Sequence, residues 1–335
     1  MKRILVIRKH NHLGDMLCSL PLYAAVKQRW PECAITLLAA PTSYQVPLRR
    51  INPFIDELLY FDKRSVFTVL RLLLHLRRRR YDLVLVPSTI RLSATSHITA
   101  RLTAAPVRTG VRSIDGKKNE HAKWLTQAID VRWESDRVHQ VHRNLQIAAA
   151  VGCSTAIDPE SALRIAITEP ERGLARSAFD GLPSDALRIG VHPGAGKREN
   201  VWPAEQFTEV IRAMRTEGNV SVLVTAGTPD ADVVSRFGAQ LEAERIPFAI
   251  LRDADIPVLA SAAAQTDVFL SNDTGTMHVA AFGGARVVSL FGPTPAWEWA
   301  PLHAHCVAIQ SRDGSMNGIT TEEVTAACRK LRRER

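Results

Sequence analysis

A glycine-rich loop that carries two cations is the segment best suited to binding a phosphorylated ligand. Residues 192–203 read His-Pro-Gly-Ala-Gly-Lys-Arg-Glu-Asn-Val-Trp-Pro. Glycine lets the backbone approach a diphosphate closely, and the charges of Lys197 and Arg198 could neutralise that group. The loop is not a Walker loop, because the patterns GxxxxGKS and GxxxxGKT are absent. A surface turn with two cations present by chance is the competing interpretation.

A second polar segment could bind an anion through its backbone. Residues 271–278 read Ser-Asn-Asp-Thr-Gly-Thr-Met-His, and a helix is predicted to begin near Thr274. The free amides of a helix N-terminus, here those of residues 274–276, attract negative charge. Asp273 by itself is most simply the residue that caps this helix. His278 lies four residues after Thr274 on the same helix face, where a lone histidine is more often structural.

The third polar segment follows the first apolar run of the chain. Residues 10–15 read His-Asn-His-Leu-Gly-Asp, so Asp15 stands near the start of the next predicted helix. The helix dipole and free amides favour a carboxylate there, and an N-terminal cap is the plain interpretation. Gly14 permits a close backbone approach or a positive φ. The dinucleotide fingerprint GxGxxG is absent, which argues against a nicotinamide or flavin enzyme.

Each polar segment follows a predicted strand, and strands alternate with helices along the chain. In the first half we predict strands at 3–7, 34–39, 58–61 and 83–86, and helices at 16–30, 66–76 and 136–151. In the second half we predict strands at 188–192, 220–225, 268–270 and 286–291, and helices at 204–217, 230–243, 258–264 and 277–282. Such alternation is typical of parallel sheets covered by helices on both faces.

The chain is long enough for two domains. Residues 152–186 contain Gly, Pro and Ser without a long apolar strand, so we place the domain junction there. The predicted fold class is α/β, with two Rossmann-like domains at residues 1–170 and 186–335 that face each other across a cleft. Ligands bind at the carboxyl ends of the strands in such sheets, which is where the three polar segments stand. Residues from about 108 to 145 interrupt the alternation, and residues 115–121 are predicted to form a polar loop.

Composition narrows the class of protein. Lys and Arg total 43 against 34 Asp and Glu, a net charge of +9, and Arg77–Arg80 form a basic run. Such a run attracts polyanions or anionic lipid, although cations at a helix C-terminus are an equally good explanation. Five widely spaced cysteines without a CxxC pair suggest neither a zinc site nor a disulfide framework. The sequence shows no membrane-spanning run and no signal peptide, so we expect a cytoplasmic protein.

Four motifs occur in order along the chain and together resemble one known family. They are Leu13-Gly14-Asp15, residues 192–196 leading to Trp202-Pro203, residues 271–275 with His278, and Phe291-Gly292-Pro293-Thr294. In these motifs the chain resembles the heptosyltransferases of glycosyltransferase family 9, which build the inner core of lipopolysaccharide. The resemblance covers nearly the whole length, and the set of four is specific to the family but not to one member.

The resemblance implies a GT-B fold and a metal-independent, inverting transfer of heptose from ADP-heptose to a lipopolysaccharide core acceptor. It makes Asp15 the general base that takes the proton of the acceptor hydroxyl. It implies an acceptor-binding N-terminal domain and a nucleotide-sugar-binding C-terminal domain, with no cofactor and no metal. The residues that it assigns to donor binding are Gly14, Gly194, Ala195, Lys197, Arg198, Asn200, Trp202, Gly227, Asp273, Thr274, Gly275 and His278.

Several of these donor-site residues have expected roles. The amides of Thr274 and Gly275 would stabilise the leaving diphosphate, and His278 would lie beside it. Asp273 would hold a sugar hydroxyl or fix its loop. For the nucleoside, we expect the loop after Val224, with Gly227, Asp230 and Asp232, to approach the ribose.

The chain departs from the family pattern at one position. Many relatives carry a lysine two residues before the tryptophan of the Trp-Pro pair, and here that residue is Asn200. Lys197 or Arg198 could take its place at the phosphate.

Other functions remain open at this point. They are a related glycosyltransferase with another sugar nucleotide or acceptor, a sugar-nucleotide epimerase, and a nucleotide-sugar-binding protein without turnover. A glycan acceptor other than lipopolysaccharide is equally open, and peripheral contact with an anionic inner membrane is a further hypothesis. Nucleic-acid binding is disfavoured, because aromatic residues make up only 6% of the chain and no recognition motif is present.

Overall fold

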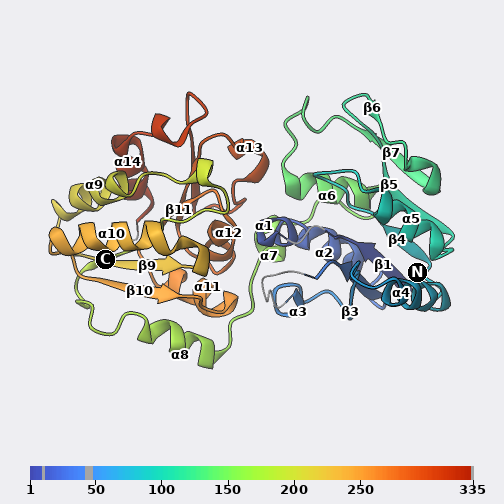
Figure 1. Cartoon of the computed structure of the whole chain (residues 1–335), viewed down its shortest axis with the longest axis horizontal. Coiled ribbons are helices and arrows are strands. Elements are labelled where there is room, and N and C mark those ends of the chain that lie inside the picture. Colours follow the sequence, from blue (N-terminus) through green and yellow to red (C-terminus); the bar gives the residue numbers. More distant parts are fainter. Residues whose placement is uncertain (10–11, 42–47, 333–335) are drawn as a thin grey trace. The chain divides into compact units, whose positions relative to one another are not determined.

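The computed structural model describes residues 1–9, 12–41 and 48–332, and at residues 159–160 it describes the backbone alone (Figure 1). His10 and Asn11, the first two residues of the polar segment 10–15, lie outside the described residues. The chain divides into two compact units, Met1–Leu163 and Arg164–Arg335.

The first unit is built on a sheet in which strands pair in the order β3-β2-β1-β4-β5, with β7 also beside β5. All these pairs are parallel, and only the short β6 runs antiparallel to the end of β5. Strands β2 and β3 are added on one side of β1 and the next ones, from β4 onward, on its other side. This strand order is the Rossmann arrangement. The strands are β1 (Arg3–Ile7), β2 (Ala34–Ala39), β3 (Glu57–Tyr60), β4 (Leu83–Leu85), β5 (Val107–Ile114), β6 (Lys117–Lys118) and β7 (Gln127–Val131).

Helices of the first unit pack in pairs against this sheet. Helix α2 contacts α6, and α4 contacts α5. Alternate strand residues such as Leu5, Ile7 and Val84 form one buried cluster with α4 and α5, as the two-residue period of a strand requires. The helices are α1 (Leu13–Leu17), α2 (Leu20–Arg29), α3 (Leu48–Ile51), α4 (Val66–Arg78), α5 (Ala94–Leu102), η1 (Ala122–Trp124), α6 (Gln140–Ala149) and α7 (Pro159–Ala162).

The second unit repeats the same arrangement with an entirely parallel sheet. Its strands pair in the order β10-β9-β8-β11-β12-β13, which again reverses direction in the middle, between β8 and β11. The strands are β8 (Leu187–His192), β9 (Val220–Ala226), β10 (Phe248–Arg252), β11 (Val268–Asn272), β12 (Val287–Phe291) and β13 (Cys306–Gln310). The prediction of two Rossmann-like α/β units is confirmed.

Two layers of helices cover this second sheet. Val222 and Val224 of β9 pack with α9, α10 and α14, whereas Leu223 between them packs with α8 and α11. The helices are α8 (Glu169–Ser177), η2 (Arg198–Asn200), α9 (Ala204–Arg215), η3 (Thr228–Asp230), α10 (Ala231–Ala243), α11 (Ile256–Ala264), α12 (Gly275–Phe282), α13 (Ala296–Trp299), η4 (Met316–Gly318) and α14 (Thr321–Leu331).

Two segments differ from the prediction. The helix predicted at 16–30 is two helices, because Pro21 has no N–H and fits only the first turn of α2. Residues 107–131 form strands β5, β6 and β7, where a break was expected. The two units divide after Leu163, within the predicted junction at residues 152–186. The first unit ends before residue 170, because α8 carries Ala175 into the core of the second unit.

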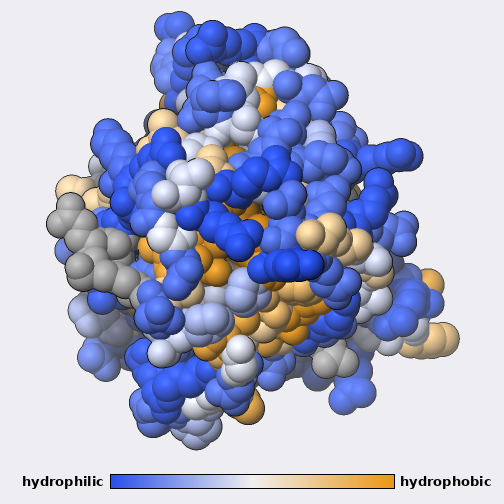
Figure 2. Space-filling view, turned by 90° about the vertical axis from the view of Figure 1, so that its left-hand side faces the viewer, coloured by the Kyte–Doolittle hydropathy of each residue, from blue (hydrophilic) through white to orange (hydrophobic). Residues whose placement is uncertain are grey.

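One face of the molecule is largely polar. On the face drawn in Figure 2, hydrophilic side chains gather over most of the surface, and hydrophobic side chains show between them near the centre. Among the helices that the structure describes, none combines the length and the apolarity that crossing a bilayer demands.

Candidate active site

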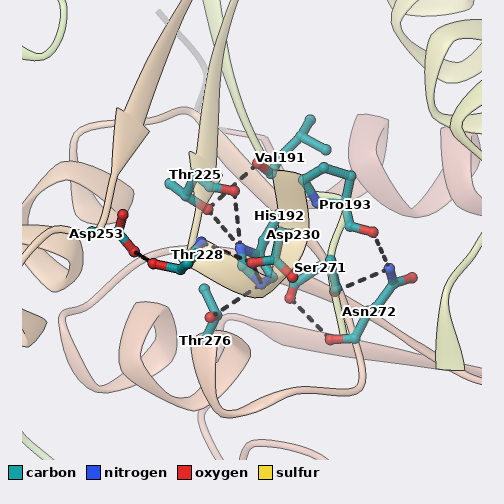
Figure 3. Close-up of polar contacts among 12 residues, drawn as sticks. Val191, His192, Pro193, Thr225, Thr228, Asp230, Asp253, Ser271, Asn272 and Thr276 are labelled. Carbon is teal, nitrogen blue, oxygen red and sulfur yellow. Dashed lines mark hydrogen bonds and ion pairs between the residues drawn. The ribbon is translucent and has the colours of Figure 1, made fainter. Parts of the chain in front are cut away.

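The polar segments after β8 and β11 meet because these strands are neighbours in the second sheet. His192, the last residue of β8, is opposite Ser271 of β11 in the register. Asn272 joins the two loops through its side chain (Figure 3). Its amide donates to the carbonyl oxygens of Pro193 at 2.8 Å and Gly194 at 3.3 Å, and its oxygen accepts from the backbone N–H of Trp202 at 3.2 Å. This edge is the point where the strand order reverses, which is where Rossmann sheets bind ligands.

Gly194 is glycine because no room exists for a side chain. A β carbon at this position would overlap the carboxylate of Asp230, lying 2.9 Å from Oδ2 and closer to the other two atoms of that group. Asp230 ends the short helix η3 and accepts a hydrogen bond from the backbone N–H of Gly227 at 2.8 Å. The carboxylate thus fixes the loop after β9 and fills the space that a side chain at residue 194 would need.

His192 is buried beneath this loop and is held in one orientation. Its Nδ1 lies 3.0 Å from the carbonyl oxygen of Thr225, and its Nε2 lies 3.4 Å from the hydroxyl of Thr276 (Figure 3). Asp230 Oδ2 is 3.8 Å from the same Nε2. Burial lowers the pKa of His192 below its ordinary value, and the nearby carboxylate opposes the shift only in part. We infer that His192 is neutral at pH 7 and acts as a fixed polar support.

Asp273 is held by Asn200. The Asn200 amide donates to Asp273 Oδ2 at 2.8 Å and lies 3.3 Å from the hydroxyl of Thr294. Burial raises the pKa of the Asp273 carboxyl, while the hydrogen bond with Thr294 and the charge of Lys197 act in the opposite direction. The arrangement leaves an oriented carboxylate at the carboxyl edge of the sheet, suited to accepting hydrogen bonds from hydroxyl groups.

Helix α12 begins beside this carboxylate. Thr274 is its N-cap residue in extended conformation, and the Thr274 side chain makes no capping hydrogen bond. The amides of Gly275 and Thr276 therefore stand in the first turn of an eight-residue helix, in the position where such groups bind phosphate. Among the described residues, no group of three or more His, Cys, Asp or Glu side chains is arranged to hold a metal ion.

Some residues that were predicted to bind the donor are buried and pack against neighbouring side chains. Trp202 is completely buried, packs edge-on against Phe207 with ring centroids 4.9 Å apart, and donates to the carbonyl of Ile319. It fixes the loop and has no surface with which to contact a donor. His278 is also buried and packs against Phe282. Four other predicted donor-site residues are exposed or partly exposed: Ala195, Lys197, Arg198 and Gly227.

Gly14 and Asp15 belong to the first unit, at the corresponding edge of the other sheet. Asp15 is the third residue of the short helix α1, as expected, and it is buried. The guanidinium of the buried Arg8 donates to the backbone oxygen of Asp15 at 2.8 Å and to Asn144 Oδ1 at 3.0 Å. It also reaches the carbonyl of Pro87 at 3.3 Å. Arg8 therefore ties the segment after β1 to the segment after β4 and to α6.

A shallow hollow lies beside Arg8, where the strand order of the first sheet reverses. It is lined by Ile7, Arg8, Lys9, Pro87, Ser88, Thr89, Ile90, Ser93 and Ser96. The Lys9 ammonium lies 3.7 Å from the centroid of the Phe61 ring and has no hydrogen-bond partner among the described residues. Burial, with a smaller contribution from the charge of Lys63, lowers the pKa of Lys9 to about 7. A largely buried ammonium that makes no hydrogen bond with the described residues is suited to meeting an anionic ligand group.

Replacing Lys9 by methionine should stabilise the fold more in acid than in base. The pKa of Lys9 is about 7 in the folded protein against an ordinary value of 10.5, so the cost of burying its charge is complete below about pH 7. That cost fades as the pH rises from about 7 to about 10.5. Thermal melts of Lys9→Met should show a gain in Tm at about pH 6 that largely disappears by about pH 10. The exposed Lys117→Met serves as control, and an equal gain at both pH values would contradict the assignment.

Sequence reasoning placed Asn272 in its motif and expected Asp230 near the ribose, but it missed Arg8 and Lys9 and the contacts that hold the loops in place. The supporting roles of Arg8, Asn272 and Asp230 depend on contacts with distant segments. The one available signal was their charge or polarity directly after a buried apolar run, at the strand edge where ligands bind.

Comparison with known proteins identifies the family. A family model described as glycosyltransferase family 9 (heptosyltransferase) matches residues 69–326. Lipopolysaccharide heptosyltransferase 3 of Escherichia coli K12 is similar, at 25% identity over 297 residues that cover 86% of this chain and 82% of that protein.

Solved structures show the same fold. A glycosyltransferase family 9 protein from Veillonella parvula superposes with a TM-score of 0.78 at 22% identity, covering 98% of this chain and 97% of that one. The E. coli ADP-heptose lipopolysaccharide heptosyltransferase II superposes with a TM-score of 0.75 at 24% identity, covering 99% and 98% of the two chains. The expectation of a GT-B fold is confirmed by these likenesses.

Proposed function

The chain belongs to glycosyltransferase family 9 and is a glycosyltransferase, and we propose that it transfers a heptose from ADP-heptose to a lipopolysaccharide core acceptor with inversion at the sugar carbon. The observation that carries the proposal is the meeting of the glycine-rich loop, the start of α12 and the Asp273 carboxylate at one sheet edge. Diphosphate and sugar need different partners, and this edge offers amides for the first and a carboxylate for the second.

The donor diphosphate is proposed to bind at the start of α12. The amides of Gly275 and Thr276 donate to its oxygens, and the backbone of Gly194 and Ala195 lies on the opposite loop. Lys197 or Arg198 supplies the positive charge, because both are exposed on that loop and the relatives' lysine is here the buried Asn200. As the bond to the sugar breaks, these groups stabilise the charge that develops on ADP.

The transferred sugar is proposed to be oriented by Asp273. Its carboxylate accepts hydrogen bonds from sugar hydroxyls, and Asn200 holds it in position through the 2.8 Å hydrogen bond. Asn200 is thus a positioning residue in this proposal. The choice of ADP as nucleotide rests on family membership and on the similar E. coli ADP-heptose enzyme.

The acceptor is proposed to bind the first unit, with Asp15 as the general base. An acceptor hydroxyl attacks the anomeric carbon and its proton passes to the Asp15 carboxylate, while the bond from carbon to diphosphate oxygen breaks. One such displacement inverts the configuration at that carbon. Arg8 fixes the backbone of Asp15, and Lys9 in the adjoining hollow offers a cation to an acidic acceptor.

Calorimetric titration tests the donor directly. ADP, UDP, GDP and their sugar conjugates are titrated into the protein in the presence of EDTA. The proposal expects selective binding of ADP and ADP-heptose. Preference for UDP or GDP would mean that the protein uses a different nucleotide sugar as donor. Conversion of a nucleotide sugar without any acceptor would support an epimerase.

Lys197→Ala is expected to weaken ADP binding by roughly 1.5–3 kcal/mol, the contribution of a charged hydrogen bond. Arg198→Ala is the matched variant, because the two cations are adjacent and both exposed. Calorimetry on both variants separates their roles. If only Arg198→Ala weakens ADP binding, Arg198 and not Lys197 contacts the phosphate. If neither variant weakens it, the backbone amides bind the phosphate without either cation.

A further inference from the structure

Helix α4 of the first unit is apolar on two opposite faces, of which only one is packed. Val69, Leu72 and Leu76 face the sheet and join the buried cluster beneath the helix. On the other side, the fractional exposure is 72% for Val66, 84% for Phe67, 52% for Leu70 and 55% for Leu74. Val66, Leu70 and Leu74 are spaced four residues apart, so they form one stripe along the helix with Phe67 beside it.

This stripe is unusual among the described residues. Most other large apolar side chains with high exposure stand singly on different elements, whereas α4 contributes four. Single exposed apolar residues are normal in a folded protein, but a contiguous group marks an interaction surface. Helix α5, which packs beside α4, adds the partly exposed Ile98 and Leu102.

Positive charge surrounds the stripe. Residues 63–81 contain seven cations, Lys63, Arg64, Arg71 and Arg77–Arg80, and no acidic residue. Arg79 pairs with Glu57 at 2.5 Å and Arg64 pairs with Asp62 at 2.6 Å. Arg71, Arg77, Arg78 and Arg80 are exposed and form no ion pair with any residue that the structure describes. Cations at the C-terminus of a helix are favoured by its dipole, which accounts for Arg77–Arg79 but not for the apolar stripe.

The positive charge around the stripe distinguishes between two kinds of binding partner, a second copy of this chain and an anionic membrane. A second copy of this chain would bring an identical set of cations against the first, and like charges across an interface oppose association. An anionic bilayer complements both features, because its acyl boundary accepts apolar side chains and its headgroups attract arginine. A helix of this kind lies in the plane of the membrane surface and does not cross it.

We propose that α4 is a membrane-binding helix that inserts Val66, Phe67, Leu70 and Leu74 into the surface of an anionic bilayer, with Arg71, Arg77 and Arg78 at the headgroups. The proposal is independent of which sugar the protein transfers. Membrane binding should then have two separable contributions. Salt screens the attraction between the arginines and the headgroups, but it does not screen the apolar contact, which carries no charge.

Vesicle sedimentation with the full chain tests the proposal. The probes are vesicles of phosphatidylcholine alone and of phosphatidylcholine mixed with phosphatidylglycerol. The protein should bind the mixed vesicles, and part of the binding should persist at high salt. The double variant Phe67→Ser with Leu70→Ser should lower the partition coefficient at least about tenfold and abolish the salt-resistant part.

Two controls make the result specific. Leu174→Ser removes an equally exposed leucine (61% exposed) from α8 of the second unit and should bind vesicles as the unchanged protein does. Replacing Arg71, Arg77 and Arg78 together by glutamine should reduce binding to the mixed vesicles at low salt. Thermal melts confirm that each variant folds, as expected for exposed positions.

Three results would overturn the proposal. The unchanged protein could fail to bind mixed vesicles at low salt, or the double variant could bind them equally well. Alternatively, light scattering could show a dimer that the double variant converts to monomer without any vesicle binding in either form. That last result would assign the stripe to a second copy of the chain.

Discussion

Asp15→Asn should reduce the rate of sugar transfer by roughly a thousandfold or more while leaving ADP binding unchanged. An acceptor hydroxyl has a pKa far above neutrality, and removing a positioned base typically costs about 10²–10⁴ in rate. Asparagine has nearly the same shape as aspartate but cannot take a proton at neutral pH. Asp15 is buried on α1, where Arg8 donates to its backbone oxygen, so a substitution that keeps the side-chain volume changes the chemistry without opening a cavity.

Controls separate catalysis from folding in this variant. Thermal melts should stay close to those of the unchanged protein, and calorimetry should give the same ADP affinity, because the donor is proposed to bind the second unit. The exposed Asp136→Asn should retain full transfer. A rate within about threefold of the unchanged protein in Asp15→Asn would mean that another group accepts the proton.

Gly194→Ala should weaken donor binding by about tenfold to a hundredfold. The new methyl group would overlap the Asp230 carboxylate, so either the glycine-rich loop or the loop after β9 has to move. Asn272 donates to the carbonyl oxygens of Pro193 and Gly194, so a shift there would carry the backbone that is proposed to bind phosphate away from the start of α12. A displacement of about 1 Å in a binding site can cost on the order of a hundredfold in function.

The same loop contains the matched control. Gly196 is two residues away, and a β carbon there would meet no atom within 4 Å. Gly196→Ala should therefore bind ADP with nearly unchanged affinity in the calorimeter. Equal affinities for the two alanine variants would show that the close approach of Gly194 to Asp230 has no part in donor binding.

The α/β architecture was predictable because strands and helices alternate with clear apolar periods. Strands such as β8 and β9 were predicted to within one residue, since a strand buried on both faces is a continuous apolar run. Residues 107–131 were missed because the central residues of β5, including Arg108, Gly110 and Arg112, break that pattern. The single helix predicted at 16–30 was wrong at Pro21. This residue stands in the first turn of a second helix, α2, and the turn of the chain before α2 was not visible in the apolar pattern.

The candidate site was predictable in its location but not in its internal contacts. The polar segments after β8 and β11 follow buried strands, and the topology brings their ends together. Nothing local shows that Asn200 holds Asp273, or that Arg8 reaches both Asp15 and Asn144, because 73 and 136 residues separate two of these pairs. Trp202 was assigned to the donor from its motif, and its burial against Phe207 follows from packing that only the fold provides.

Mass spectrometry of the acceptor after reaction with ADP-heptose in the presence of EDTA would show whether the protein transfers heptose. A lipopolysaccharide core fragment serves as acceptor, and released ADP is quantified in the same sample. We predict that the acceptor gains one heptose for each ADP released, and that Asp15→Asn forms both products roughly a thousandfold or more slowly. ADP released without modification of the acceptor, or transfer only from a UDP or GDP sugar, would contradict it.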